Sequence, residues 1–167
     1  TATSAAFADA DGAQVAGDTL EYTVAWQDAD GNGYSTTVKF TVGDTTTELI
    51  AEDGTKYTVT DTATKDELAN AVISELKKDS NLSAAFDITN SASALQFTSK
   101  ATGSAGATIT ALTGSGTIST ASLGSTIAAS TDAADASQKL DLSKVTVVDA
   151  TGSNVPTADD LNDAVFE

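Results

Sequence analysis

The sequence predicts a mainly β protein: antiparallel strands with one packed amphipathic helix, followed by a small second β module. Three observations lead to this fold class. Several runs alternate apolar and polar residues with a period of two, as half-buried strands do. One segment, residues 64–78, has a helical period and opens with a capping pattern. The chain is also rich in threonine, a β-branched residue that suits a pleated surface.

The first predicted element is a β-hairpin over residues 20–42. Every second residue in 20–26 and in 34–42 is aromatic or β-branched or aliphatic, which is typical of a strand with one buried face. The run Asp-Ala-Asp-Gly-Asn-Gly at 28–33 is a dense turn signal between them. The small, polar residues 1–18 predict a loop or a weak edge strand. The two apolar faces consist of Leu20, Tyr22, Val24 and Trp26, and of Tyr34, Thr36, Val38, Phe40 and Val42.

A second hairpin and a helix come next. Residues 46–51 and 56–60 flank Glu-Asp-Gly-Thr, which predicts a hairpin turn. Thr64 and Glu67 have the spacing of a capping box, in which each side chain accepts a hydrogen bond from the other residue's backbone. Leu68, Val72 and Leu76 follow at i, i+4 and i+8, so we expect a helix of about 14 residues with one apolar stripe.

Further strands are predicted at 85–89, 95–99, 108–112 and 145–148, with a break over 79–83. Residues 113–138 are rich in Gly, Ser, Thr and Ala, with few large apolar residues. They predict either short edge strands or a mobile segment.

A short internal repeat links the middle of the chain to its end. Residues 64–72 and 157–165 are identical at five of nine positions, and each copy follows a strand-like run. Thr157 and Asp160 would cap the second helix as Thr64 and Glu67 cap the first. We interpret 145–167 as the start of a second, truncated module. The alternative is that any capped amphipathic helix in an acidic, Ala-rich protein would look similar.

Composition excludes several kinds of chemistry. The 167 residues include no Cys and no His, so zinc sites with N or S ligands, thiol chemistry and imidazole-based triads are ruled out. There is no Arg and the net charge is −16, which disfavours nucleic acid and anionic membranes as partners. No apolar run is long enough to insert in a membrane. The absence of Met predicts a fragment or a processed piece. We expect no enzyme activity.

The sharpest candidate site is a calcium-type turn at Asp28, Asp30 and Asn32. These residues and Gly33 match the first six positions of an EF-hand loop. Position 12 would be Lys39, where a bidentate Glu is needed, and strands flank the turn, so a full EF-hand is rejected. We favour a hairpin turn held by local hydrogen bonds. A weak Ca²⁺ site is the alternative; otherwise no cofactor is expected.

Other constellations have simpler explanations. The adjacent acids Asp66/Glu67 and Asp159/Asp160 fit helix N-termini better than a catalytic pair, which needs two carboxylates facing each other across a cleft. The aromatic residues of the first hairpin could form a sugar-binding platform, but a place in the core is favoured.

One region resembles a known family. Residues 57–72, 82–88 and 95–103 resemble the insertion motif of bacterial flagellins and related hook and hook-associated proteins. In that motif a strand leads into a short helix and then a hairpin. The hairpin ends in a pattern matched here by Leu95, Phe97, Thr98, Ser99 and Gly103. Trp26 departs from the family, which contains little tryptophan.

The resemblance implies a domain organisation and a role. Residues 1–112 would form a β-rich domain containing the hairpin 20–42 and an insertion-like unit 50–112. Residues 113–144 would be edge strands or a linker, and 145–167 the second module. We expect a structural, surface-exposed outer domain of an extracellular flagellar filament or hook protein. Its partners would be neighbouring subunits of the same filament, contacted through regions outside this fragment.

Two other roles remain open at this point. The first is a calcium-stabilised β module of a large bacterial surface adhesin, with the ion at the turn 28–32. The second is a phage tail decoration domain, since similar strand–helix–hairpin units look common in phage tail proteins.

Overall fold

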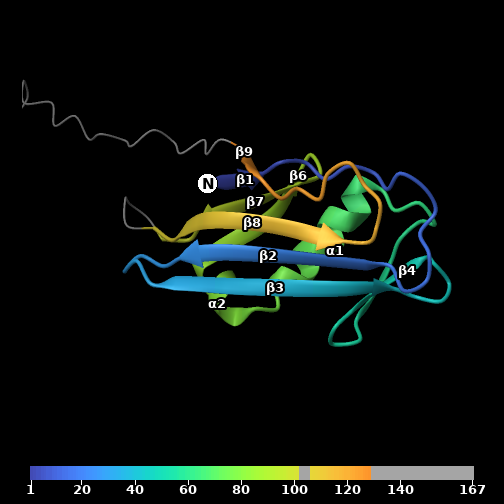
Figure 1. Ribbon diagram of the computed structural model, residues 1–167. Helices are drawn as coiled ribbons and strands as arrows, with labels where there is room; N and C mark the ends of the chain where they lie inside the picture. Colours follow the sequence, from blue (N-terminus) through green and yellow to red (C-terminus); the bar gives the residue numbers. More distant parts are fainter. Residues whose placement is uncertain (102–105, 129–167) are drawn as a thin grey trace, which may run out of the picture. The chain divides into compact units, whose positions relative to one another are not determined.

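Two antiparallel β-sheets and two helices make up the described part of the protein, residues 1–101 and 106–128 of a computed structural model (Figure 1). The five-stranded sheet has the order β5-β4-β3-β2-β8, and the four-stranded sheet has the order β6-β7-β1-β9. The predicted mainly β class with a packed helix is confirmed. The strand predicted at 145–148 and the module predicted at 145–167 lie outside the described residues.

The predicted first hairpin is confirmed. Strands β2 (Thr19–Gln27) and β3 (Gly33–Val42) pair from Thr19↔Thr41 to Gln27↔Gly33. Their alternation buries one face and exposes the other, as the period of two predicts. Tyr34 is the exception on the predicted apolar face, because it lies beside the turn of the hairpin and is 40 % exposed.

The second hairpin and the capped helix are also confirmed. Strands β4 (Glu48–Ala51) and β5 (Lys56–Thr58) extend the five-stranded sheet. Helix α1 (Lys65–Leu76) begins after Thr64, whose hydroxyl accepts a hydrogen bond from the Glu67 backbone, while the Glu67 carboxylate accepts one from the Thr64 backbone. This capping box is the one that the sequence predicts. Its apolar stripe is buried.

A second helix replaces the break predicted at 79–83. Helix α2 (Ser80–Ala85) is capped by Asp79, whose carboxylate accepts hydrogen bonds from the backbone of Asn81 and Leu82. The Thr36 hydroxyl of β3 also donates to this carboxylate. Burial raises the pKa of Asp79, but these hydrogen bonds outweigh burial and leave the pKa below its usual value. Asp79 therefore ties α2 to the five-stranded sheet.

The hairpin of β6 (Phe86–Ser91) and β7 (Ala94–Ser99) is fastened to the start of α1. Its two turn residues, Ala92 and Ser93, both have positive φ, as a two-residue hairpin turn requires. The Ser93 hydroxyl donates to the Asp66 carboxylate at 2.7 Å, and the Asn90 amide donates to the Asn70 side chain at 2.9 Å. Helix α1 and the hairpin thus form one packed unit.

The two ends of the described chain meet in the four-stranded sheet. Strand β1 (Ala2–Ser4) lies between β7 and β9 (Ile127–Ala128), so it is an interior strand and not the predicted loop or edge strand. Strand β8 (Thr108–Gly116) continues past the predicted domain boundary at 112. Ile118 is buried and Leu123 packs against the core, so the first unit extends beyond residue 112. Residues 113–116 belong to β8 and 127–128 form β9, and the stretch between them makes only isolated bridges at Thr120 and Leu123.

A single hydrophobic core lies between the elements. It joins the inner face of the five-stranded sheet to α1 and to the hairpin β6–β7, and α1 contacts β3 as well as β6 and β7. Tyr22 crosses this core, and its hydroxyl donates to the Gly124 carbonyl at 2.7 Å. The described helices are too short or too polar to span a membrane.

Candidate functional site

The calcium-type turn is built around the carboxylate of Asp28. Its Oδ1 accepts hydrogen bonds from the backbone N–H groups of Asp30 and Asn32, both at 2.9 Å. Its Oδ2 accepts from the Asn32 side-chain amide at 2.9 Å and from the Tyr34 hydroxyl at 3.0 Å. Gly31 has φ +84°, which a residue with a side chain rarely adopts. The residues predicted for the site therefore come together as a hydrogen-bonded turn.

These contacts set the charge of the turn. The Asn32 side-chain hydrogen bond, followed by those from the backbone and from Tyr34, holds the pKa of Asp28 below its usual value. The same Asp28 hydrogen bond and charge raise the pKa of Tyr34. Asp28 is thus a stable carboxylate at neutral pH. Its four hydrogen bonds favour the interpretation as a hairpin turn, and calcium binding by Asp28, Asp30 and Asn32 stays a prediction.

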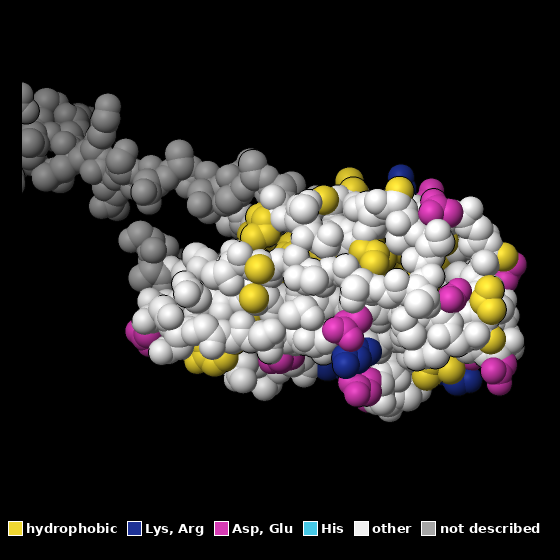
Figure 2. All heavy atoms as spheres, in the orientation of Figure 1, with side chains coloured by type: hydrophobic (Ala, Val, Ile, Leu, Met, Phe, Trp, Pro, Cys, Tyr) yellow, Lys and Arg dark blue, Asp and Glu magenta, His cyan; other side chains and the backbone are white. Residues whose placement is uncertain are grey.

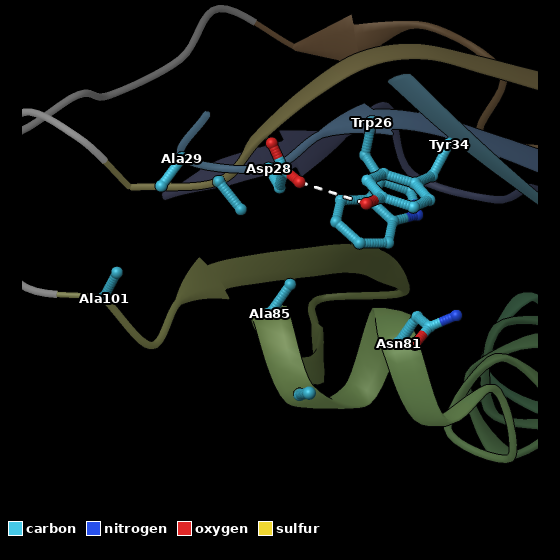
Figure 3. A pocket seen from close by; sticks show the side chains of 9 residues that line it. Trp26, Asp28, Ala29, Tyr34, Asn81, Ala85 and Ala101 are labelled. Atoms are coloured by element: carbon cyan, nitrogen blue, oxygen red, sulfur yellow. Dashed lines mark hydrogen bonds between the residues drawn. The ribbon is translucent and has the colours of Figure 1, made fainter. Parts of the chain in front are cut away.

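A pocket opens beside this turn, between the end of the β2–β3 hairpin and helix α2 (Figure 3). Its volume is about 320 Å³, which is at the small end of the range for ligand sites. Most of its wall is alanine, and its polar side chains are one carboxylate, one amide and one phenol. The lining residues are Trp26, Asp28, Ala29, Tyr34, Asn81, Ala84, Ala85, Ala101 and Ala107.

An aromatic pair forms one side of the pocket. Trp26 and Tyr34 are direct cross-strand neighbours, and their rings stack with centroids 4.5 Å apart and planes 19° apart. Phe86 meets the other side of Trp26 edge-on at 5.7 Å. Trp26 is only 3 % exposed, so it belongs to the core, as the sequence favours. Its indole N–H is buried without a hydrogen-bond partner among the described residues.

The chemistry of this pocket is limited. Among the described residues, Asp28 is the one acidic residue that lines it, so they do not supply two facing carboxylates of the kind a glycosidase uses. Within 1–101 and 106–128, no three or more Asp or Glu side chains gather in a way that could hold a metal ion. The pocket can accept a small apolar group beside a fixed negative charge, but it presents no acid–base pair.

Two of the predicted capping residues, Thr64 and Glu67, lie within the described residues. The Glu67 carboxylate also accepts hydrogen bonds from the hydroxyl and backbone of Thr60, at 2.8 and 3.0 Å. Burial raises the pKa of Glu67, but its hydrogen bonds with Thr64 and Thr60 outweigh burial and lower the pKa overall. Both acids of the pair Asp66/Glu67 therefore serve the local structure. Thr157, Asp159 and Asp160 lie outside the described residues.

A second hollow of about 420 Å³ lies along residues 10–18 and 117–119. Asp11 and Asp18 line it, and each carboxylate accepts a hydrogen bond from a hydroxyl of the facing segment, from Ser119 and Thr117 respectively. No sequence pattern marks Asp18 or Ser119 as part of a site. Asp11 and Asp18 accept hydrogen bonds from residues more than 90 positions away, and the sequence does not indicate these partners.

The chain was compared with protein-family models, with curated proteins and with solved structures, and none of them matches it. The resemblance of residues 50–112 to the flagellar insertion motif stays a prediction from the sequence pattern alone.

Proposed function

We propose that this chain is a structural, non-catalytic domain exposed on an extracellular bacterial assembly, as the outer domain of a flagellar filament or hook protein. The observation that carries the proposal is the succession of β5, α1 and the β6–β7 hairpin, with the hairpin hydrogen-bonded to α1. Most of the residues that give the resemblance to the flagellar insertion motif lie in β5, α1, α2 and the β6–β7 hairpin, in this order, and Gly103 lies outside the described residues.

The hydrogen bonds of four carboxylates support the same structural role. Asp28 holds a turn, Glu67 and Asp79 cap helices, and Asp66 fastens a hairpin to α1. Each of these groups stabilises the fold at a specific place. The lysines that the structure describes lie largely in surface ion pairs, such as Lys56 with Glu48 at 2.9 Å. Such pairs contribute little to stability, and they leave an acidic, hydrophilic exterior suited to an exported subunit (Figure 2).

A deletion in the parent gene tests the proposal. Cells whose protein lacks residues 1–128 should still assemble extracellular filaments, because the domain adds outer surface and the polymerising contacts lie elsewhere. These filaments should be thinner in negative-stain electron microscopy, and the intact gene should restore their diameter. Filaments of unchanged diameter, or the absence of filaments from the wild-type strain, would contradict the proposal.

A calcium-stabilised module of an adhesin is the second candidate. The arrangement that favours it is the close grouping of Asp28, Asp30 and Asn32 in one exposed turn. In that case the deletion would abolish attachment to surfaces and leave filament diameter unchanged.

A further inference from the structure

We infer that the outer edge of strand β8 binds the same edge of a second copy of this chain. The pairing would be antiparallel and would join the two five-stranded sheets into one. It stands independently of the proposed function, although in a filament it would supply a contact between neighbouring outer domains.

Strand β8 is the longest edge strand among the described residues. It has nine residues and pairs with β2 on one side, and no described strand pairs with its other side (Figure 1). Every second N–H and C=O group of β8 therefore points away from β2. Such an edge is a template for pairing with another strand unless it is blocked.

The other described edges are short or carry charges. Strand β5 has three residues and includes Lys56, and β9 has two residues. Strand β6 carries Asp87, which forms an ion pair with Lys100. Lysine, charge and short length are the usual devices against edge-to-edge association. By contrast, β8 reads Thr-Ile-Thr-Ala-Leu-Thr-Gly-Ser-Gly, without charge or proline, in a chain of net charge −16.

This neutrality favours a second copy as the occupant. Two acidic surfaces repel each other, but two β8 edges bring no like charges together. The outward-facing residues of β8, which are Ala111, Thr113 and Ser115, are small and exposed. A two-fold axis would place this set opposite itself, which is the self-complementary geometry of a symmetric dimer.

Two features fix the extent of the contact. A bulge in β8 opposite Ala25 and Trp26 leaves residues 111–116 as the regular part of the edge. Ile109, Leu123 and Ile127 remain only partly buried around β8 and β9, and Figure 2 shows hydrophobic atoms at the surface around β8. Six residues span about 20 Å, which is small for an interface, so we expect weak association with a dissociation constant of roughly 10–500 µM.

Sedimentation equilibrium of the full chain and of two matched variants tests the inference. Thr113→Lys puts a charge on β8, whereas Thr37→Lys puts the same charge in the same row of the sheet, two strands away. Both residues are exposed, and both variants make the net charge less negative by one unit. Thr113→Lys should raise the dissociation constant at least tenfold, and Thr37→Lys should change it less than about twofold, with both circular dichroism spectra unchanged.

Two results would overturn the inference. The first is a wild-type chain that stays monomeric at about 1 mM, well above the expected dissociation constant. The second is a dimer that Thr113→Lys and Thr37→Lys weaken equally or not at all, because association would then run through another surface.

Discussion

Replacing Gly116 by alanine tests how β8 joins the sheet. Gly116 ends β8 opposite Leu20 and has φ +150°, a conformation that side-chain-bearing residues rarely adopt. A Cβ atom there would lie 2.1 Å from the carbonyl oxygen of Thr19 and 2.9 Å from its carbonyl carbon. That oxygen also accepts hydrogen bonds from the backbone of Thr117 and Ile118, so a shift of the carbonyl would disturb both.

The size of the effect follows from these contacts. Backbone strain at an unfavourable φ costs roughly 1–3 kcal/mol. An overlap that forces the backbone to move costs about another 1–3 kcal/mol. We therefore expect Gly116→Ala to lower the free energy of unfolding by about 2–6 kcal/mol. In a domain of this size, that corresponds to a fall in Tm of roughly 6–30 °C.

Thermal melting followed by circular dichroism measures this change. Gly33→Ala is the matched control, because a Cβ at Gly33 would have no heavy atom within 4 Å and its φ is not positive. This control should alter the free energy of unfolding by less than about 1 kcal/mol. A Tm for Gly116→Ala within about 2 °C of wild type would refute the described pairing of β8 with β2 at this end.

Three further predictions concern the caps and the turn. Thr64→Ala should lower the free energy of unfolding by about 1 kcal/mol in urea titrations, because it removes the N-cap of α1. The control Thr62→Ala should leave the free energy of unfolding unchanged. Equal effects of the two variants would argue against the cap. The pKa values of Asp28 and Asp79 are lowered in the folded state, so their stabilisation is present above the unfolded-state pKa of about 4 and is lost on acidification. The urea midpoint should therefore be lower at pH 3 than at pH 7, and equal midpoints would contradict this. Calcium at 1 mM should leave Tm and Trp26 fluorescence unchanged. If the turn binds calcium, a hundredfold excess over the dissociation constant would raise the free energy of unfolding by about 2.7 kcal/mol, and this result would support the adhesin.

Local patterns were sufficient to predict the hairpins and the main helix. The alternation in β2 and β3 fixes which face is buried, because a strand has a period of two. The pair Thr64 and Glu67 marks the start of α1, because a capping box needs only residues three positions apart. These elements depend on neighbours in sequence, and a single sequence contains that information.

Elements that depend on distant partners were missed. Helix α2 has six residues, too few to show a period, and its cap Asp79 also depends on Thr36 of β3. Strand β1 has three residues and is defined by pairing with β7, more than 90 positions away. The composition of residues 113–138 left short edge strands and a mobile segment as alternatives, because it does not show that Gly116 is required by close approach to β2.

The candidate site could likewise be predicted only where it depends on residues close in sequence. The turn at Asp28 follows from its own six residues, so the hydrogen-bonded hairpin could be predicted. The pocket beside it could not, because Asn81 and Ala85 reach it from a helix that the sequence did not reveal, and Ala107 from the approach to β8. Alanine side chains have no functional group that a sequence pattern could mark, so only the fold shows that these residues line the same pocket.

The most direct test of the proposed role is the labelling of intact cells. The chain has no Cys, so a single introduced Cys is unique within it. Ser35→Cys is exposed on the outer face of β3, whereas Val24→Cys lies in the core and serves as the buried control. A membrane-impermeant maleimide dye on living cells should decorate extracellular filaments at residue 35 and leave residue 24 unlabelled until the protein is unfolded. Labelling at residue 35 only after lysis would contradict a surface-exposed structural domain.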